Sequence, residues 1–215
     1  IMSDLLLDNE QARKLIKTLG LPLPVPERLR RAKGPYEERP LEGKVVLVGN
    51  SLGGHIALLF QKLFPERVAG IVLAGSSGLY ESAMGNSYPR RGDRNYIAER
   101  VRDVFAVKEV ATDELIDQVF DTVNDRMKAI KTLAISKSAI RHNMAEDITK
   151  YNVPVCLVWG RQDAVTPPDV AEKIHELLPN AELNWIDHCG HAAMMEHPNE
   201  FNAIVEKWLQ KIQVA

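Results

Sequence analysis

Cysteine is scarce in this sequence, and so are the features that direct a chain to or through a membrane. The two cysteines, Cys156 and Cys189, are too few for a disulfide framework and lack the paired spacing of a zinc site. The first residues include the acids Asp4 and Asp8 where a signal peptide needs a basic start, and no apolar run reaches membrane-spanning length. These absences predict a soluble, cytoplasmic protein with reduced thiols and no membrane partner.

An excess of basic charge is also absent. Lysine and arginine number 27 against 29 aspartates and glutamates, which gives a formal net charge of -2. A basic stretch at residues 28–33 is followed by Glu37 and Glu38 and has no interleaved aromatic side chain on which bases could stack. Because no positive field attracts a polyanion, we expect no nucleic-acid partner.

The beginning of the chain has the pattern of an arm rather than of a sheet. Apolar residues at helical spacing predict a helix over residues 8–19, which a glycine and a proline just beyond it would end. Five prolines follow over residues 21–40, and proline fixes φ and removes the N–H donor that a strand needs. We therefore expect an N-terminal helix and a proline-rich arm over residues 1–44.

From residue 45 onward the hydrophobic pattern alternates between buried strands and amphipathic helices. Short apolar runs that end in turn residues predict four strands, at residues 45–48, 71–74, 155–159 and 183–186. Helical patterns follow them at residues 55–64, 169–178 and 199–212. This repeat predicts an α/β fold with a mostly parallel sheet and flanking helices.

A helical insertion interrupts the repeat. Between Gly78 and about Lys150 no strand-like run occurs. Helical spacing there predicts helices at residues 96–105, 113–123 and 126–141, and Thr112 is a suitable N-cap for the second. The chain beyond the arm therefore divides into a core over residues 45–78 and 150–215 and a helical cap over residues 79–149.

The turn after the first predicted strand carries the pattern G-x-S-x-G, in Gly49-Asn50-Ser51-Leu52-Gly53. Between a buried strand and a helix, this pattern forms a strained turn that projects the serine hydroxyl beyond the strand. Glycines two before and two after the serine let strand and helix pass closely. Ser51 is therefore the candidate nucleophile, and the N–H of Leu52, at a helix N-terminus, is the candidate oxyanion donor.

Two other kinds of glycine-rich turn fail to fit this position. A phosphate-binding P-loop needs Gly-Lys-Ser or Gly-Lys-Thr, but Gly54 is followed by His55. A dinucleotide fingerprint needs a third glycine, which neither His55 nor Ile56 supplies. The turn therefore predicts a nucleophile rather than a nucleotide cofactor.

A serine nucleophile needs a histidine base that is held by a carboxylate, in the chain order Ser, Asp, His for this type of fold. Asp163 follows the third predicted strand and His191 follows the fourth. Both positions lie beyond carboxyl ends of strands, where ligand sites gather in open parallel sheets. We therefore predict a triad of Ser51, Asp163 and His191.

Rivals exist for both partners of the serine. Asp187 and Asp169 compete with Asp163, but the chain order favours Asp163. His188 competes with His191, which we favour because Gly190 gives its loop freedom. Cys189 lies beside the proposed base, although a thiol nucleophile would need its own base within reach.

Four motifs, in order along residues 45–212, resemble those of the α/β-hydrolase superfamily of esterases, C–C bond hydrolases and related enzymes: VGNSLGGH (48–55), FPERV (64–68), VPVCLVWGRQD (153–163) and GHAAMMEHP (190–198). The resemblance implies Ser51 as nucleophile, Asp163 as acid and His191 as base. It also implies that the helices of residues 79–149 cap an apolar acyl pocket, with no metal or organic cofactor. A serine at the nucleophile position argues against the dehalogenase branch, which uses an aspartate.

The stretch before the serine departs from that superfamily. Its members place further strands there and a loop with a His-Gly type motif whose N–H completes the oxyanion hole. Residues 4–48 instead resemble the amino-terminal stretch of large 3-oxoacyl-acyl-carrier-protein reductases, in KTLGLP (17–22) and GPYEERP (34–40), although no Tyr-x-x-x-Lys pair follows. We therefore expect a truncated α/β-hydrolase fold and a chimera joined near residue 44.

Two hypotheses of different classes follow. The first is a carboxylesterase-like serine hydrolase that cleaves small acyl esters through an acyl-enzyme intermediate. The alternative is a non-catalytic or weakly active core that serves as a folding or assembly scaffold, because loss of one oxyanion donor lowers the rate by roughly 10²- to 10³-fold. Without preceding strands, the strand at residues 45–48 would be an unpaired edge, so we also expect a homodimer that buries it.

Overall fold

The computed structural model describes residues 43–80 and 90–212. The helix expected over residues 8–19, and all but the last two residues of the arm expected over 1–44, lie outside these ranges. None of the helices in the described ranges has both the length and the apolar character that crossing a membrane requires.

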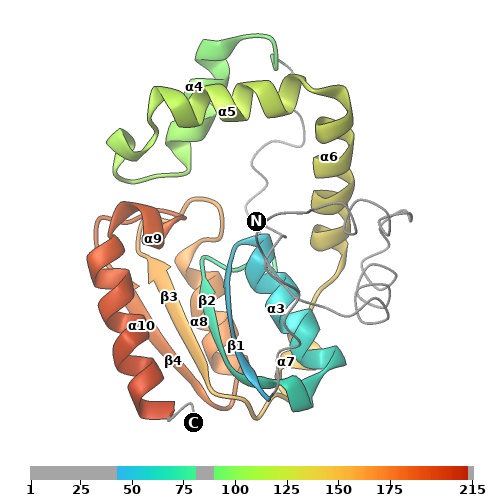
Figure 1. Ribbon diagram of the computed structural model, residues 1–215, viewed down its shortest axis with the longest axis vertical. Coiled ribbons are helices and arrows are strands. Elements are labelled where there is room, and N and C mark those ends of the chain that lie inside the picture. Colours follow the sequence, from blue (N-terminus) through green and yellow to red (C-terminus); the bar gives the residue numbers. More distant parts are fainter. Residues whose placement is uncertain (1–42, 81–89, 213–215) are drawn as a thin grey trace.

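The described residues contain one sheet, built from the four strands that the apolar runs predict. In spatial order they are β1 (Val45–Asn50), β2 (Val68–Ala74), β3 (Val155–Gly160) and β4 (Ala181–Ile186). All three pairings are parallel. The carboxyl ends of the strands therefore lie at one end of the sheet, toward α9 in Figure 1.

Helices cover both faces of this sheet, which explains why its strands have continuous apolar runs. Helices α3 (Leu52–Leu63) and α8 (Pro168–Leu177) pack on the face that carries Ile71 and Leu73. Helix α10 (Pro198–Ile212) packs on the other face, where Trp208 joins Val72 and Ala74. The α/β fold with a parallel sheet and flanking helices is confirmed. Two short elements complete it: η1 (Pro65–Arg67) and α9 (Ala193–Glu196).

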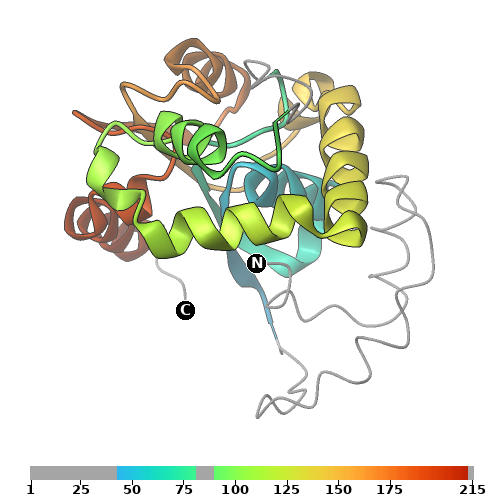
Figure 2. The same cartoon turned by 90° about the horizontal axis from the view of Figure 1, so that it is seen from above.

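Helices replace strands between β2 and β3, as their spacing predicts. They are α4 (Arg94–Asp103), η2 (Lys108–Val110), α5 (Asp113–Asn124), α6 (Arg126–Arg141) and α7 (Ala145–Ile148). The hydroxyl of Thr112 accepts the N–H of Leu115, so its predicted role as the N-cap of α5 is confirmed. Helices α4 and α5 lie over the carboxyl end of the sheet (Figures 1 and 2).

The segment over the sheet has a small apolar core of its own. Ile97, Val101, Phe105 and Ile116 are buried there, and Ala192 of the core, next to His191, joins the same cluster. Burial of these side chains against Ala192 fixes the segment above the ends of β3 and β4. We call residues 94–141 the cap helices.

Candidate active site

The turn between β1 and α3 holds Ser51 in an unusual backbone conformation. Its φ is 52° and its ψ is -122°, in a region that residues other than glycine rarely adopt. Its N–H donates to the carbonyl of Ala74 at 3.1 Å, and its carbonyl accepts the N–H groups of Gly54 and Ser77, each at 3.0 Å. These bonds to the end of β2 and to α3 hold the serine in the strained conformation that the G-x-S-x-G pattern predicts.

The strand and helix that flank Ser51 approach closely, but the glycines responsible differ in part from those expected. A Cβ on Gly49 would lie 2.4 Å from the backbone carbonyl of Gly53, and one on Gly54 would lie 2.1 Å from Oγ of Ser76. A Cβ on Gly53 would meet nothing within 4 Å. The close packing therefore depends on Gly49 and Gly54, whereas Gly53 has open space beside it.

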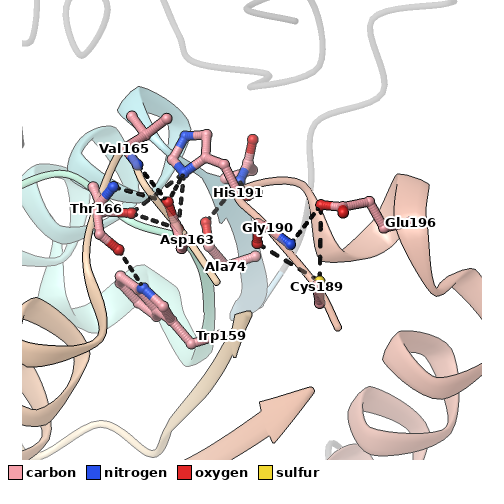
Figure 3. A network of polar contacts seen from close by, with 10 residues as sticks. Ala74, Trp159, Asp163, Val165, Thr166, Cys189, Gly190, His191 and Glu196 are labelled. Atoms are coloured by element: carbon pink, nitrogen blue, oxygen red, sulfur yellow. Dashed lines mark hydrogen bonds and ion pairs between the residues drawn. The ribbon is translucent and has the colours of Figure 1, made fainter. Parts of the chain in front are cut away.

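Asp163 and His191 are in contact, as the chain order predicts. Nδ1 of His191 donates to Oδ2 of Asp163 at 2.9 Å, and both side chains are buried (Figure 3). A carboxylate on Nδ1 fixes the ring's orientation and leaves Nε2 as the nitrogen that can accept a proton. The pair thus has the geometry of a base and the acid that orients it.

The carboxylate of Asp163 is fixed by the residues that follow it in the chain. Oδ1 accepts the N–H groups of Val165 and Thr166, at 2.8 and 2.9 Å, and Oδ2 accepts the hydroxyl of Thr166 at 2.8 Å. The carbonyl of Thr166 in turn accepts the indole N–H of Trp159 (Figure 3). These donors hold the carboxylate in one orientation and satisfy a charge that is shielded from water.

Two contacts place this pair beside the serine turn. A Cβ on Gly75, the residue after Ala74, would lie 2.9 Å from both Oδ2 of Asp163 and Nδ1 of His191. The amide of Asn50 donates to the carbonyls of Ala74 and His191, at 2.8 and 3.0 Å. In the described part of the chain the Ser51 hydroxyl is not hydrogen-bonded to the ring of His191. The structure therefore pairs the acid with the base and places the serine turn next to them.

The rival carboxylates and the rival histidine lie elsewhere. Asp187 is exposed and pairs with Nε of Arg161 at 2.8 Å, and Asp169 accepts the hydroxyl of Tyr80 at 2.5 Å. The side chain of His188 is exposed. Of the candidates weighed from the sequence, only Asp163 and His191 are brought together.

The two cysteines are poor alternative nucleophiles. Both are fully buried, and burial raises the pKa of each thiol to about 12. A thiol with such a pKa is almost entirely protonated at neutral pH, and the thiolate is the reactive form.

Residues 43–80 and 90–212 do not bring together three or more His, Cys, Asp or Glu side chains that could hold a metal ion.

Leu52 is the first residue of α3, so its N–H has no partner within the helix and remains available to an oxyanion. Asn50, Gly75, Thr166 and Glu196 also contribute to the site, although none of them belongs to the triad or the oxyanion donor predicted from the sequence. Thr166 had one detectable signal, because a threonine three residues after an aspartate in a loop can cap its carboxylate. The other three act through contacts distant in sequence.

A parallel sheet with a serine at its strand-to-helix turn, and an Asp–His pair at the ends of two further strands, defines the α/β hydrolases as a class. Residues 18–204 match the alpha/beta hydrolase family, so the chain belongs to that family. The match begins at residue 18 and crosses the expected junction near residue 44. The chimera with a 3-oxoacyl-acyl-carrier-protein reductase therefore has no support.

Two relatives of this chain are hydrolases of unsaturated 2-hydroxy-6-oxo acids by name. The 2-hydroxy-6-oxononadienedioate/2-hydroxy-6-oxononatrienedioate hydrolase of Burkholderia vietnamiensis is 28% identical over 79% of this chain and 63% of its own. The 2-hydroxy-6-oxo-6-(2'-aminophenyl)hexa-2,4-dienoic acid hydrolase of Metapseudomonas resinovorans is also 28% identical, over 81% of this chain and 62% of its own. The chain thus spans less than two thirds of the length of these relatives.

Solved structures of other α/β hydrolases are similar to this chain. An α/β hydrolase from the metagenome of lagoon sediments at Mar Chica, Morocco, is 48% identical over 79% of this chain and 62% of its own, with a TM-score of 0.60. A serine hydrolase involved in carbazole degradation is 28% identical over 81% of this chain and 66% of its own, with a TM-score of 0.65. The chain is thus a member of the α/β-hydrolase family whose described fold is a truncated part of the fold of its relatives.

Proposed function

We propose that this chain is a serine hydrolase in which Ser51 attacks a substrate carbonyl, with His191 as base and Asp163 as the acid that orients it. One observation carries the proposal: the buried Asp163–His191 pair packs against Gly75. Gly75 directly follows Ala74 in the chain, and the carbonyl of Ala74 accepts the N–H of Ser51. The strained conformation of Ser51 supports it further, because such strain concentrates at active sites.

The reaction would take two steps. Ser51 Oγ adds to the carbonyl carbon while Nε2 of His191 accepts its proton, and the oxyanion forms near the N–H of Leu52. The leaving group then takes the proton from His191, which leaves an acyl group on Ser51. In the second step His191 removes a proton from water, which attacks the acyl carbon and releases the carboxylic acid.

For the substrate we propose a small acyl ester, which the cap helices would cover on the side facing the carboxyl ends of the strands. The ester is the simplest substrate of an acyl-enzyme mechanism and needs no further catalytic group. A specific observation favours a second candidate, a C–C bond of a 2-hydroxy-6-oxo-dienoate, because relatives 28% identical to this chain are named as hydrolases of 2-hydroxy-6-oxo acids. Both candidates need a nucleophile, a base and an acid.

The experiment combines turnover with labelling. Purified protein should hydrolyse p-nitrophenyl butyrate, and a fluorophosphonate should add to Ser51 in a single adduct located by peptide mass spectrometry. Ser51→Ala should abolish both, whereas Cys156→Ala should retain both because that thiol is buried within β3, away from the histidine loop. An adduct at another residue, or turnover unchanged in Ser51→Ala, would show that the mechanism is wrong.

Comparing the two substrates separates the remaining candidates. Turnover of 2-hydroxy-6-oxo-6-phenylhexa-2,4-dienoate at a higher kcat/KM than the ester would favour the C–C hydrolase. Turnover of the ester alone would favour the esterase. A folded protein that neither turns over nor reacts with the fluorophosphonate would be the non-catalytic scaffold.

A further inference from the structure

Glu196, the last residue of α9, is a buried carboxylate that the proposed mechanism does not use. Its Oε1 accepts the N–H of Gly190 at 2.9 Å (Figure 3). Its Oε2 accepts the N–H groups of Ala106 and Val107, at 2.7 and 2.9 Å. One carboxylate therefore receives three backbone donors from two distant parts of the chain.

The two parts are the loop that carries His191 and the segment that leads out of α4, residues 104–107. A further bond joins them directly, because the N–H of His191 donates to the carbonyl of Val104 at 3.0 Å. They are also tightly packed, since a Cβ on Gly190 would lie 2.6 Å from that carbonyl and 2.7 Å from the nitrogen of Ala106. The cap helices and the histidine loop thus meet at Glu196.

The chemistry of the carboxylate explains why this position suits a glutamate. An ionised carboxylate only accepts hydrogen bonds, and bonds to it from backbone N–H groups are shorter and stronger than neutral ones. An amide in its place offers one acceptor and one donor group. The NH2 group of a glutamine would face either the N–H of Gly190 or the N–H groups of Ala106 and Val107. Those buried N–H groups would then lack an acceptor.

We infer that Glu196 is a positioning residue, which ties the His191 loop to residues 104–107 of the cap so that cap and base are placed together. The inference rests on the proposed function, in which His191 is the base. It also has a consequence for the cycle: a cap displacement that withdraws Ala106 and Val107 from Glu196 also loosens the loop of the base. The base is then held in place when the cap is seated.

The first test is a double-mutant cycle on p-nitrophenyl butyrate hydrolysis. Glu196→Gln should lower kcat/KM, and the rate of fluorophosphonate labelling of Ser51, by about tenfold or more, because a small misplacement of a catalytic group has effects of that size. The matched control is Glu200→Gln, which removes the same charge from an exposed position one turn along the chain. In the His191→Ala background, Glu196→Gln should have no further effect on the residual rate.

Two results would overturn the inference. The first is a Glu196→Gln variant that matches the parent in turnover and labelling. The second is a Glu196→Gln change that lowers the residual rate of His191→Ala by the same factor as it lowers the rate of the parent. The second result would mean that Glu196 stabilises the fold without acting through the base. By contrast, a parent protein that is neither labelled at Ser51 nor active would count against the proposed function.

A second test does not depend on activity. It uses a milder substitution, which serves if the Glu196→Gln variant does not fold. Val107→Pro removes a single donor from the carboxylate, and the φ of Val107, -82°, is close to that of proline. Amide hydrogen exchange should then become at least about tenfold faster in the histidine loop, residues 188–191, although the change was made in the cap. Exchange that accelerates only around residue 107 would overturn the coupling.

Discussion

At the scale of single residues, Asp163 is held by more donors than the orientation of a histidine requires. Three donors from Val165 and Thr166 reach its carboxylate in addition to the ring of His191. Since all of them point at the carboxylate, any replacement that carries a donor of its own disturbs the local loop as well as the histidine. Substitutions of Asp163 and of Thr166 can therefore separate the effect on the catalytic rate from the effect on stability.

Asp163→Asn should lower kcat by about 10³-fold or more, because the amide favours the wrong tautomer of His191. It should also lower the free energy of unfolding by about 1–3 kcal/mol, since its NH2 group faces buried donors. Thr166→Val, which removes one donor and keeps the side chain's shape, should lower kcat far less. Ester hydrolysis and urea unfolding of both variants check this; an Asn variant with half of the parent's kcat would contradict it.

His55 gives a prediction for the dependence of stability on pH. Its Nε2 lies 3.0 Å from Nδ1 of His142, and burial, followed by the nearby His142, lowers its pKa from 6.5 to about 4. Between these two values the unfolded chain binds a proton that the folded protein does not. Above pH 6.5 His55 is neutral in both states and does not lower the free energy of unfolding. As the pH drops from 6.5 to about 4, this histidine lowers the free energy of unfolding by up to about 3 kcal/mol.

His55→Leu should remove that part of the pH dependence, because leucine cannot take up a proton in either state. Urea unfolding at pH 4.5 and pH 7.5 gives the difference in unfolding free energy for parent and variant. His175→Leu, at an exposed position, serves as the control and should keep the parent's difference. An unchanged difference in the His55 variant would mean that another group titrates.

At the scale of elements, α3 packs closely on β1 at Gly49 and on the segment after β2 at Gly54, whereas Gly53 has open space beside it. Gly49→Ala should lower the free energy of unfolding by about 2–3 kcal/mol or more, because its Cβ would overlap the backbone of α3. Gly53→Ala should stay within about 1 kcal/mol of the parent, because its Cβ meets open space and alanine favours a helix. Thermal and urea unfolding compare the two; equal losses would contradict the structure.

The elements themselves could be predicted because their signals are local. Each strand of the sheet reads as a short apolar run, and the turn at Ser51 is defined by adjacent residues. The chain order favoured Asp163 over its rivals, and the neighbouring Gly190 favoured His191 over His188. Parallel strands bring their carboxyl ends together, so residues that follow two such strands can meet.

Contacts between distant segments were beyond a reading of one sequence. Glu196 bonds to residues about 90 positions away, and Asn50 to the carbonyl of His191, 141 positions away. Asn50 lies in the motif VGNSLGGH and Glu196 in GHAAMMEHP, but neither motif indicates which distant group the side chain contacts. The tight glycine at position 54 rather than 53 likewise depends on Ser76, which belongs to the segment after β2.

At the scale of the whole molecule, β1 is an edge of the sheet among the described residues. It pairs with β2 on one side, and Val48 is an apolar side chain with 62% of its surface exposed. An unpaired edge with an apolar face tends to pair with another chain. A two-fold arrangement buries such an edge without growing into a fibre.

We therefore propose that the protein forms a homodimer through β1, and predict its response to one substitution. Val48→Lys should shift the protein toward the monomer, because a lysine on an edge strand opposes pairing with a second edge. Light scattering on dilute, pure protein should give the mass of two chains for the parent. Leu133→Lys, which places the same charge at an exposed apolar position of α6, should leave that mass unchanged. A parent that melts cooperatively with the mass of one chain would refute the dimer, and the edge would then have to be covered within a single chain.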